Sequence, residues 1–231
     1  ALEKLPFIQK ELVYKCNMAA KPVIIATDML ESMIENEIPT RAEITDVANA
    51  ILDGTDAIMT SGETSSGKHP VESVKIMSRI AIENEKYLIP DFCETTGTQN
   101  DKISIAITNA AFEFIMDVED INKIIVYSKG GKTPKLLSRL NLPVEIIALV
   151  NTETMKKQLN LSKNVTSYLF KKDYLDRDVA VRGIIEFLAV HDIVKLSDKI
   201  LLVGHLELNS KTEQNHTNIF EYIDVSHVLD K

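Results

Sequence analysis

The sequence predicts an α/β protein with two domains, each built around a parallel or mostly parallel sheet. Short apolar runs alternate with segments whose apolar residues recur at helical spacing, which is typical of β–α units. The alternation is interrupted once, where Pro90, Gly97 and the polar run 94–100 break the pattern. We therefore expect one domain in residues 1–90 and a second in residues 91–231.

Two strand–helix units are expected in the first domain, after a helical pattern over residues 2–12. The first strand is the continuous apolar run Val23–Thr27, which indicates a strand buried on both faces. The next helix opens with a capping box, with Thr40 as the N-cap and Glu43 three residues later. That helix ends at the glycine stop Gly54.

The second unit of this domain is a short strand, Ala57–Met59, followed by a helix over Pro70–Glu85. The helix carries its apolar residues on one face, which predicts the side turned toward the core. These residues are Val71, Val74, Met77, Ile80 and Ala81.

The second domain shows the same alternation and predicts a five-stranded sheet with helices on both faces. The last strand is a candidate for antiparallel pairing. The expected strands are 123–127, 146–150, 165–170, 200–203 and 219–225, and the expected helices are 103–114, 133–140, 152–161 and 177–194.

Composition and charge are those of an ordinary globular protein. The chain has 231 residues, 45% of them hydrophobic and 26% charged, which suffices for one large or two small cores. The net charge of −8 argues against general affinity for nucleic acid or anionic membranes. Cys16 and Cys93 form no CxxC motif, the five histidines show no ligand spacing, and no apolar run reaches about 18 residues. We expect a cytoplasmic protein without a metal site of its own.

Polar residues follow both strands of the first domain. Thr27-Asp28 ends the first strand, and Ser61-Gly62-Glu63-Thr64 follows the second. Ligands of β–α folds bind at the carboxyl ends of strands, which makes these residues candidates for a site. The same residue types also serve as helix caps and turns. From the residues alone, both interpretations stay open.

Residues 21–74 read KPVIIATDMLESMIENEIPTRAEITDVANAILDGTDAIMTSGETSSGKHPVESV. They follow the patterns KPV-ATxMLESM, PTRAE-DVANA-LDG and IM-SGET almost residue for residue, and the segment resembles the pyruvate kinases. A fainter similarity covers nearly all of the remaining chain, where YSKGGKT matches a loop of the family's regulatory domain.

This resemblance implies a partial (β/α)8 barrel segment followed by a C-terminal α/β regulatory domain with a five-stranded, mostly parallel sheet. It implies transfer of phosphate from phosphoenolpyruvate to ADP, giving pyruvate and ATP in glycolysis. It also implies dependence on Mg²⁺ and K⁺ and assembly as a homo-oligomer, usually a tetramer.

The resemblance assigns catalytic positions to three residues. Thr27 falls on the threonine that lies against the substrate and is implicated in protonating the enolate, and Ser61 and Glu63 border the same pocket. Such residue types suit a step in which enolpyruvate must collect a proton on carbon. Asp28 and Thr60 depart from the family, which usually has glutamine and leucine there.

Much of the family's catalytic set has no counterpart in this sequence. The lysine that stabilises the transferring phosphoryl group, the Mg²⁺ carboxylates and the K⁺ ligands are expected upstream of Ala1. Phosphoryl transfer depends on positioned cations, so we expect the chain alone to be inactive. The alternative function is a standalone regulatory module that binds a phosphorylated ligand, and a third possibility is a remnant with neither activity.

A second candidate site is the glycine-rich loop between two predicted elements of the second domain. Its glycines, lysines and hydroxyls suit a phosphate group, with Thr133 expected as a helix N-cap and Pro134 as the first helical residue. The alternative is a plain glycine turn. The family resemblance assigns this loop to the phosphate of an effector. The residues concerned are Ser128, Lys129, Gly130, Gly131, Lys132 and Thr133.

Activated members of the family grip a second phosphate with a loop that carries tryptophan and arginine. The matching region here, residues 204–216, has neither, and its two glutamates outnumber its single lysine. This composition favours a monophosphate effector, or none, over fructose 1,6-bisphosphate.

Overall fold

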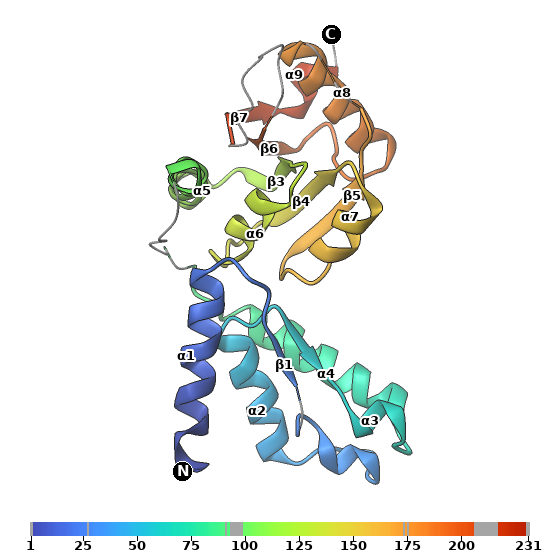
Figure 1. Ribbon diagram of the computed structural model, residues 1–231. Helices are drawn as coiled ribbons and strands as arrows, with labels where there is room; N and C mark the ends of the chain where they lie inside the picture. Colours follow the sequence, from blue (N-terminus) through green and yellow to red (C-terminus); the bar gives the residue numbers. More distant parts are fainter. Residues whose placement is uncertain are drawn as a thin grey trace. The chain divides into compact units, whose positions relative to one another are not determined.

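The computed structural model describes residues 2–26, 28–90, 92, 99–172, 174, 176–205 and 217–229. The chain divides into two compact units, Ala1–Ile89 and Pro90–Lys231, which are treated separately (Figure 1). No helix of the described ranges is long and apolar enough to cross a membrane.

The first unit contains two parallel strands and the helices that follow them. Ile24 pairs with Ala57 and Ala26 with Met59, so the two strands end side by side. The elements are η1 (Leu2–Lys4), α1 (Leu5–Met18), β1 (Ile24–Ala26), η2 (Glu31–Ile34), α2 (Arg41–Leu52), β2 (Ala57–Met59), α3 (Gly62–Ser65) and α4 (Pro70–Glu85).

Helix α2 begins as the sequence predicts. The Thr40 hydroxyl accepts the Glu43 N–H, and the Glu43 carboxylate accepts the Thr40 N–H, so the capping box is confirmed. Its buried face, with Val47, Ala50 and Ile51, packs against α4.

Helix α4 has its predicted bounds, but its buried face differs from the predicted one. Met77 and Ile80 are buried, whereas Val71 and Val74 are 57% and 53% exposed. The reason is that α4 packs mainly on α2, which covers only part of the apolar stripe. Strand β1 likewise has a more exposed face than expected, with Ile24 at 45% exposure. The sheet of the first unit has only β1 and β2 among the described residues.

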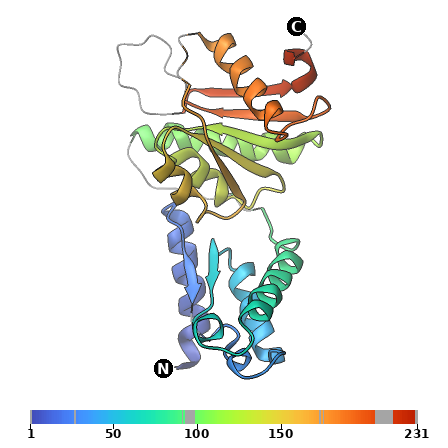
Figure 2. The same cartoon turned by 90° about the vertical axis from the view of Figure 1, so that its right-hand side faces the viewer.

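The second unit is a five-stranded sheet in the order β5-β4-β3-β6-β7 (Figure 2). The first four strands are parallel and β7 runs antiparallel to β6, as predicted. The elements are α5 (Gln99–Asp117), β3 (Ile121–Tyr127), α6 (Lys132–Ser138), β4 (Glu145–Val150), α7 (Glu153–Leu159), β5 (Val165–Leu169), α8 (Arg177–Val190), β6 (Lys199–Gly204), β7 (Ile219–Asp224) and α9 (Val225–Leu229).

Each face of this sheet has its own apolar core. Alternate residues of the strands point to opposite faces, so Ile125 packs on one side and Ile124 on the other. Helices α8 and α9 cover the first face, and α5, α6 and α7 cover the second. This arrangement confirms the expected α/β class.

Helix α8 is shorter than its apolar pattern suggests. It ends at Val190, because Asp192 adopts a left-handed conformation with φ +55°. Ile193 and Val194 nevertheless stay buried in the core, which is why the apolar pattern predicts a longer helix.

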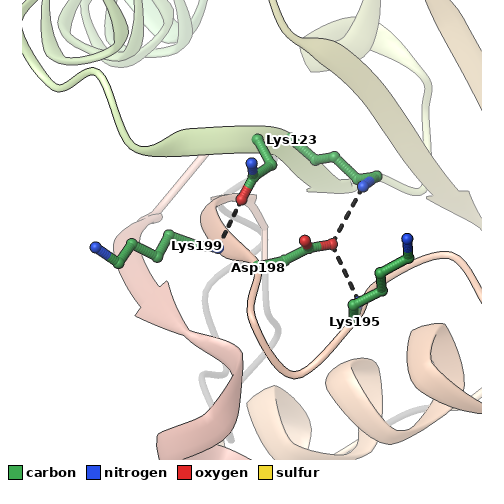
Figure 3. Close-up of polar contacts among 5 residues, drawn as sticks. Lys123, Lys195, Asp198 and Lys199 are labelled. Carbon is green, nitrogen blue, oxygen red and sulfur yellow. Dashed lines mark hydrogen bonds and ion pairs between the residues drawn. The ribbon is translucent and has the colours of Figure 1, made fainter.

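A buried carboxylate joins two strands at their amino ends. Asp198 is 8% exposed, and its Oδ2 accepts from Lys123 Nζ at 3.2 Å and from the Lys195 N–H at 3.0 Å (Figure 3). The adjacent Lys199 N–H donates to Asn122 Oδ1 at 2.9 Å. These contacts align the starts of β3 and β6, far along the strands from the glycine-rich loop.

Candidate functional site

The first candidate site lies where β1 and β2 end. Because Ala26 pairs with Met59, the segments that follow the two strands emerge at one edge of the sheet. The 28–34 segment (residues Asp28 to Ile34) follows β1, and the turn Thr60–Ser65 follows β2. Thr27, predicted to act on the substrate, falls outside the described residues.

Glu63 joins these two segments. Its Oε1 accepts the Leu30 N–H at 3.0 Å and its Oε2 accepts the Ser61 N–H at 2.6 Å. Glu63 is only 3% exposed, so both carboxylate oxygens meet backbone donors inside the unit. The residue predicted to border the pocket therefore lies at the junction and holds its two sides together.

Ser61 lies directly before the short helix α3, but its side chain does not cap it. The neighbouring Thr60 and Thr64 hydroxyls bond each other at 2.8 Å. The helix-cap interpretation therefore does not account for Ser61. Ser61 is half-buried and lies in the turn at the end of β2, and its assignment to a pocket stays a prediction.

The 28–34 segment has an irregular backbone. Asp28 has φ +54°, a left-handed conformation that aspartate tolerates better than most residues. Within the segment, Met29, Leu30 and Met33 are buried, and Glu31–Ile34 forms the single 3₁₀ turn η2. The Ile34 carbonyl also accepts the Lys68 N–H at 2.8 Å.

Glu43 contacts the same segment from α2. Its Oε1 accepts the Ser32 N–H at 2.6 Å, and its Oε2 accepts the Ser32 hydroxyl at 2.6 Å and the Thr40 N–H at 2.7 Å. Burial acts to raise the pKa of Glu43, but the hydrogen bonds from Ser32 and Thr40 outweigh it and hold the pKa below its usual value. Sequence reasoning found the capping box and missed Ser32, because no pattern within one helix links the two.

The second candidate site is the loop between β3 and α6. The Gly131 N–H donates to the buried Ser128 hydroxyl at 3.1 Å, which closes the loop on itself. Gly131 has φ +67°, and a Cβ there would lie 2.3 Å from Met155 Sδ. Gly130 is exposed, and a Cβ there would meet nothing within 4 Å. Partial burial lowers the pKa of Lys132 below its usual value.

The prediction that Thr133 is the N-cap of helix α6 is wrong. Helix α6 begins at Lys132 with Gly131 in the N-cap position, two residues earlier than predicted. Thr133 is buried and its hydroxyl bonds the Thr217 hydroxyl at 2.9 Å. Thr133 meets Thr217 because the end of β6 and the start of β7 bring Thr217 beside α6. The two residues are 84 positions apart in the sequence.

The described residues at the two candidate sites do not form a metal-binding group. Within the described ranges, no group of three or more His, Cys, Asp or Glu side chains could hold a metal ion. The Glu63 oxygens already accept N–H groups, which is the wrong pairing for a cation ligand. The described residues therefore do not fit Mg²⁺ by themselves.

Two family models match the chain: the pyruvate kinase barrel domain over residues 1–74 and the pyruvate kinase alpha/beta domain over residues 105–220. The chain belongs to the pyruvate kinase family. Pyruvate kinase of Thermococcus litoralis is 38% identical over 233 residues, which cover 95% of this chain and 46% of that protein. Pyruvate kinase of Geobacillus stearothermophilus is 36% identical, with coverage of 99% and 38%.

A solved structure gives the same relationship. A pyruvate kinase from Cryptosporidium parvum superposes with a TM-score of 0.77 and 29% identity, covering 96% of this chain and 44% of that one. The chain thus spans less than half the length of the pyruvate kinases described here. The two matched regions fall on the two units of the structure, with the β1–β2 edge inside the barrel match.

Proposed function

We propose that this chain forms the carboxyl-terminal part of a pyruvate kinase, which transfers phosphate from phosphoenolpyruvate to ADP and yields pyruvate and ATP in glycolysis. One observation carries the proposal: the polar segments after β1 and β2 meet at one sheet edge, joined by Glu63, within the residues matched to the barrel domain. Ligands of barrel enzymes bind at that edge.

The proposed chemistry of this half concerns the proton. After the phosphoryl group has moved to ADP, the enolate of pyruvate takes a proton on its methylene carbon. We assign that delivery to the Thr27 hydroxyl or to a water it holds, and we assign Ser61 to the border of the same pocket. Glu63 holds the two segments in fixed positions relative to each other, because each of its oxygens accepts a backbone N–H.

Cations supply the electrostatic stabilisation of phosphoryl transfer in this reaction class. We assign the Mg²⁺ and K⁺ ligands to parts of the complete protein outside this sequence, because the described residues offer no such group. On this proposal the 231-residue chain alone has no pyruvate kinase activity. Family membership also supports a cytoplasmic homotetramer as part of the same proposal.

A second proposed function concerns regulation. The 128–133 loop would bind one phosphate of an effector, through its exposed glycine backbone and its two lysines. The open space around Gly130 favours this role, because an anion can approach the backbone there. Helix α6 has only seven residues, so the proposal relies on the loop and its charges and leaves the helix dipole aside.

A coupled assay of pyruvate formation tests the main proposal. The complete protein in which this sequence occurs should show activity with phosphoenolpyruvate, ADP, Mg²⁺ and K⁺, and the isolated chain should show none. Thr27→Val should lower the turnover of the complete protein at least tenfold, whereas the hydroxyl-retaining Thr27→Ser should keep most of it. An inactive complete protein would overturn the proposal.

A further inference from the structure

We propose that Glu43 is a positioning residue for the site at the ends of β1 and β2, and that it acts through Ser32. The inference rests on the proposed function, because the site concerned is the proposed proton-delivery site. Nothing in the sequence pattern assigns Glu43 any task beyond the cap of its own helix.

The 28–34 segment is held by carboxylates from two different elements. Glu63, in the turn after β2, accepts the Leu30 N–H at 3.0 Å. Glu43, in the first turn of α2, accepts the Ser32 N–H and the Ser32 hydroxyl, both at 2.6 Å. The segment is therefore fastened at positions 30 and 32 by groups that approach it from separate parts of the unit.

Capping alone does not account for the Glu43 contacts. A capping box needs one contact from the Glu43 side chain, to the Thr40 N–H, and that bond is present at 2.7 Å, with a second from the Thr40 hydroxyl at 2.9 Å. The carboxylate nevertheless accepts two further hydrogen bonds from Ser32, eleven residues earlier. Both of these bonds are short, as charge-assisted hydrogen bonds are. Glu43 therefore accepts as many hydrogen bonds from the 28–34 segment as from Thr40 at the start of its own helix.

The segment needs outside support to keep one conformation. It contains only the single turn η2, and Asp28 has a left-handed backbone that regular structure does not impose. The buried side chains of Met29, Leu30 and Met33 fix its depth in the core, but apolar packing is not directional. The hydrogen bonds to Glu43 and Glu63 are directional, so they fix the orientation of the segment's backbone.

The consequence for chemistry follows from chain connectivity. Thr27 directly precedes the segment, so a displacement of Ser32 and Leu30 changes where the segment leaves β1. A proton donor must lie within hydrogen-bond reach of its acceptor, and a misplacement of about 1 Å can cost about 100-fold in rate. Glu43 contacts no reacting atom in this scheme, so its effect is on placement.

The test uses the complete enzyme and matched variants. Glu43→Gln keeps the size of the side chain but replaces one acceptor oxygen by a donor. We expect it to lower kcat about tenfold, with a much smaller change in the KM for phosphoenolpyruvate. Ser32→Ala should act in the same direction. The double variant should lower kcat no further than Glu43→Gln does, because both changes disrupt the same Glu43–Ser32 contact. Ser32→Thr, which retains the hydroxyl, should restore most of the activity.

Thr40→Ala is the matched control. It removes the N-cap hydroxyl of α2 and with it the 2.9 Å bond from that hydroxyl to Glu43 Oε2, but it leaves both bonds from Ser32 to the Glu43 carboxylate. If Glu43 acts through Ser32, kcat should therefore stay near that of the wild type. A second readout isolates the proton step: the exchange of pyruvate methyl protons with D₂O, followed by NMR. This exchange should fall in Glu43→Gln by about the same factor as kcat.

The outcomes separate the inference from the proposed function. An inactive wild-type enzyme would overturn both. An active wild type whose Glu43→Gln and Thr40→Ala variants lose equal activity would overturn the inference alone, since capping would then explain the effect. A loss confined to thermal stability, with kcat and proton exchange unchanged in Glu43→Gln and Ser32→Ala, would overturn it as well.

Discussion

The Oε1 atom of Glu63 lies 3.0 Å from the backbone nitrogen of Leu30, 33 residues earlier in the chain. The other carboxylate oxygen accepts the Ser61 N–H, so a single buried side chain joins the segments that leave two neighbouring strands. Glu63 thereby holds together the two segments that form the candidate site.

Glu63→Ala should lower the free energy of unfolding by about 2–4 kcal/mol. The buried Leu30 N–H and the partly buried Ser61 N–H both lose their acceptor, and an unpaired buried donor costs about 1–3 kcal/mol. Urea denaturation measures the change, and hydrogen exchange at Leu30 should accelerate. Glu85→Ala, at the exposed end of α4, is the control and should change stability little. Equal effects of the two substitutions would contradict the bracing role.

The pH dependence of stability should change in Glu43→Gln. The folded-state pKa of Glu43 is lowered, so its ionised form stabilises the fold above the ordinary value of 4.5, and this contribution is lost as pH falls through the folded-state pKa. Denaturation midpoints measured from pH 7 downward should therefore differ most between wild type and variant at neutral pH and converge in acid. A constant difference across this range would contradict the prediction.

Asp198→Ala should destabilise the second unit by about 1–3 kcal/mol, because the Lys195 N–H loses its acceptor and Lys123 loses its partner. A matched control lies nearby: Asp120 pairs with Lys199 at 2.5 Å but is 65% exposed. Asp120→Ala should cost less than about 1 kcal/mol, as exposed ion pairs do. Thermal denaturation compares the two, and the reverse order would be inconsistent with the structure.

The two glycines of the 128–133 loop should respond differently to alanine. Gly131→Ala places a Cβ against Met155 at a left-handed position and should destabilise by more than about 1 kcal/mol. Gly130→Ala meets open space and should be nearly neutral. Chemical denaturation of both variants tests this, and equal tolerance of alanine would show that the loop adopts another conformation.

The effector response of the complete enzyme should follow from the charges of its two loops. The complete enzyme should be insensitive to fructose 1,6-bisphosphate, because residues 204–216 supply no arginine or tryptophan for a second phosphate. Any response to a monophosphate effector should weaken in Lys129→Ala and Lys132→Ala. Titration of phosphoenolpyruvate half-saturation measures both effects, and a several-fold decrease caused by the bisphosphate would contradict the first.

Local patterns determined much of this protein in advance. The capping box of Thr40 and Glu43, the strand–helix alternation and the antiparallel last strand were all predicted correctly, because they depend on residues close in sequence or on the period of apolar side chains. The family resemblance pointed to Ser61 and Glu63 as site residues by position.

Only the tertiary structure decided which partners these groups meet. Glu43 reaches Ser32, Thr133 meets Thr217 instead of capping α6, and Glu63 accepts the Leu30 N–H. Strand pairing brings the partners of Glu63 and Thr133 together, and the packing of α2 against the 28–34 segment brings Glu43 to Ser32. No spacing within a single element encodes these contacts. The buried face of α4 was decided in the same way, since the packing of α2 selects Met77 and Ile80 from a wider apolar stripe and leaves Val71 exposed.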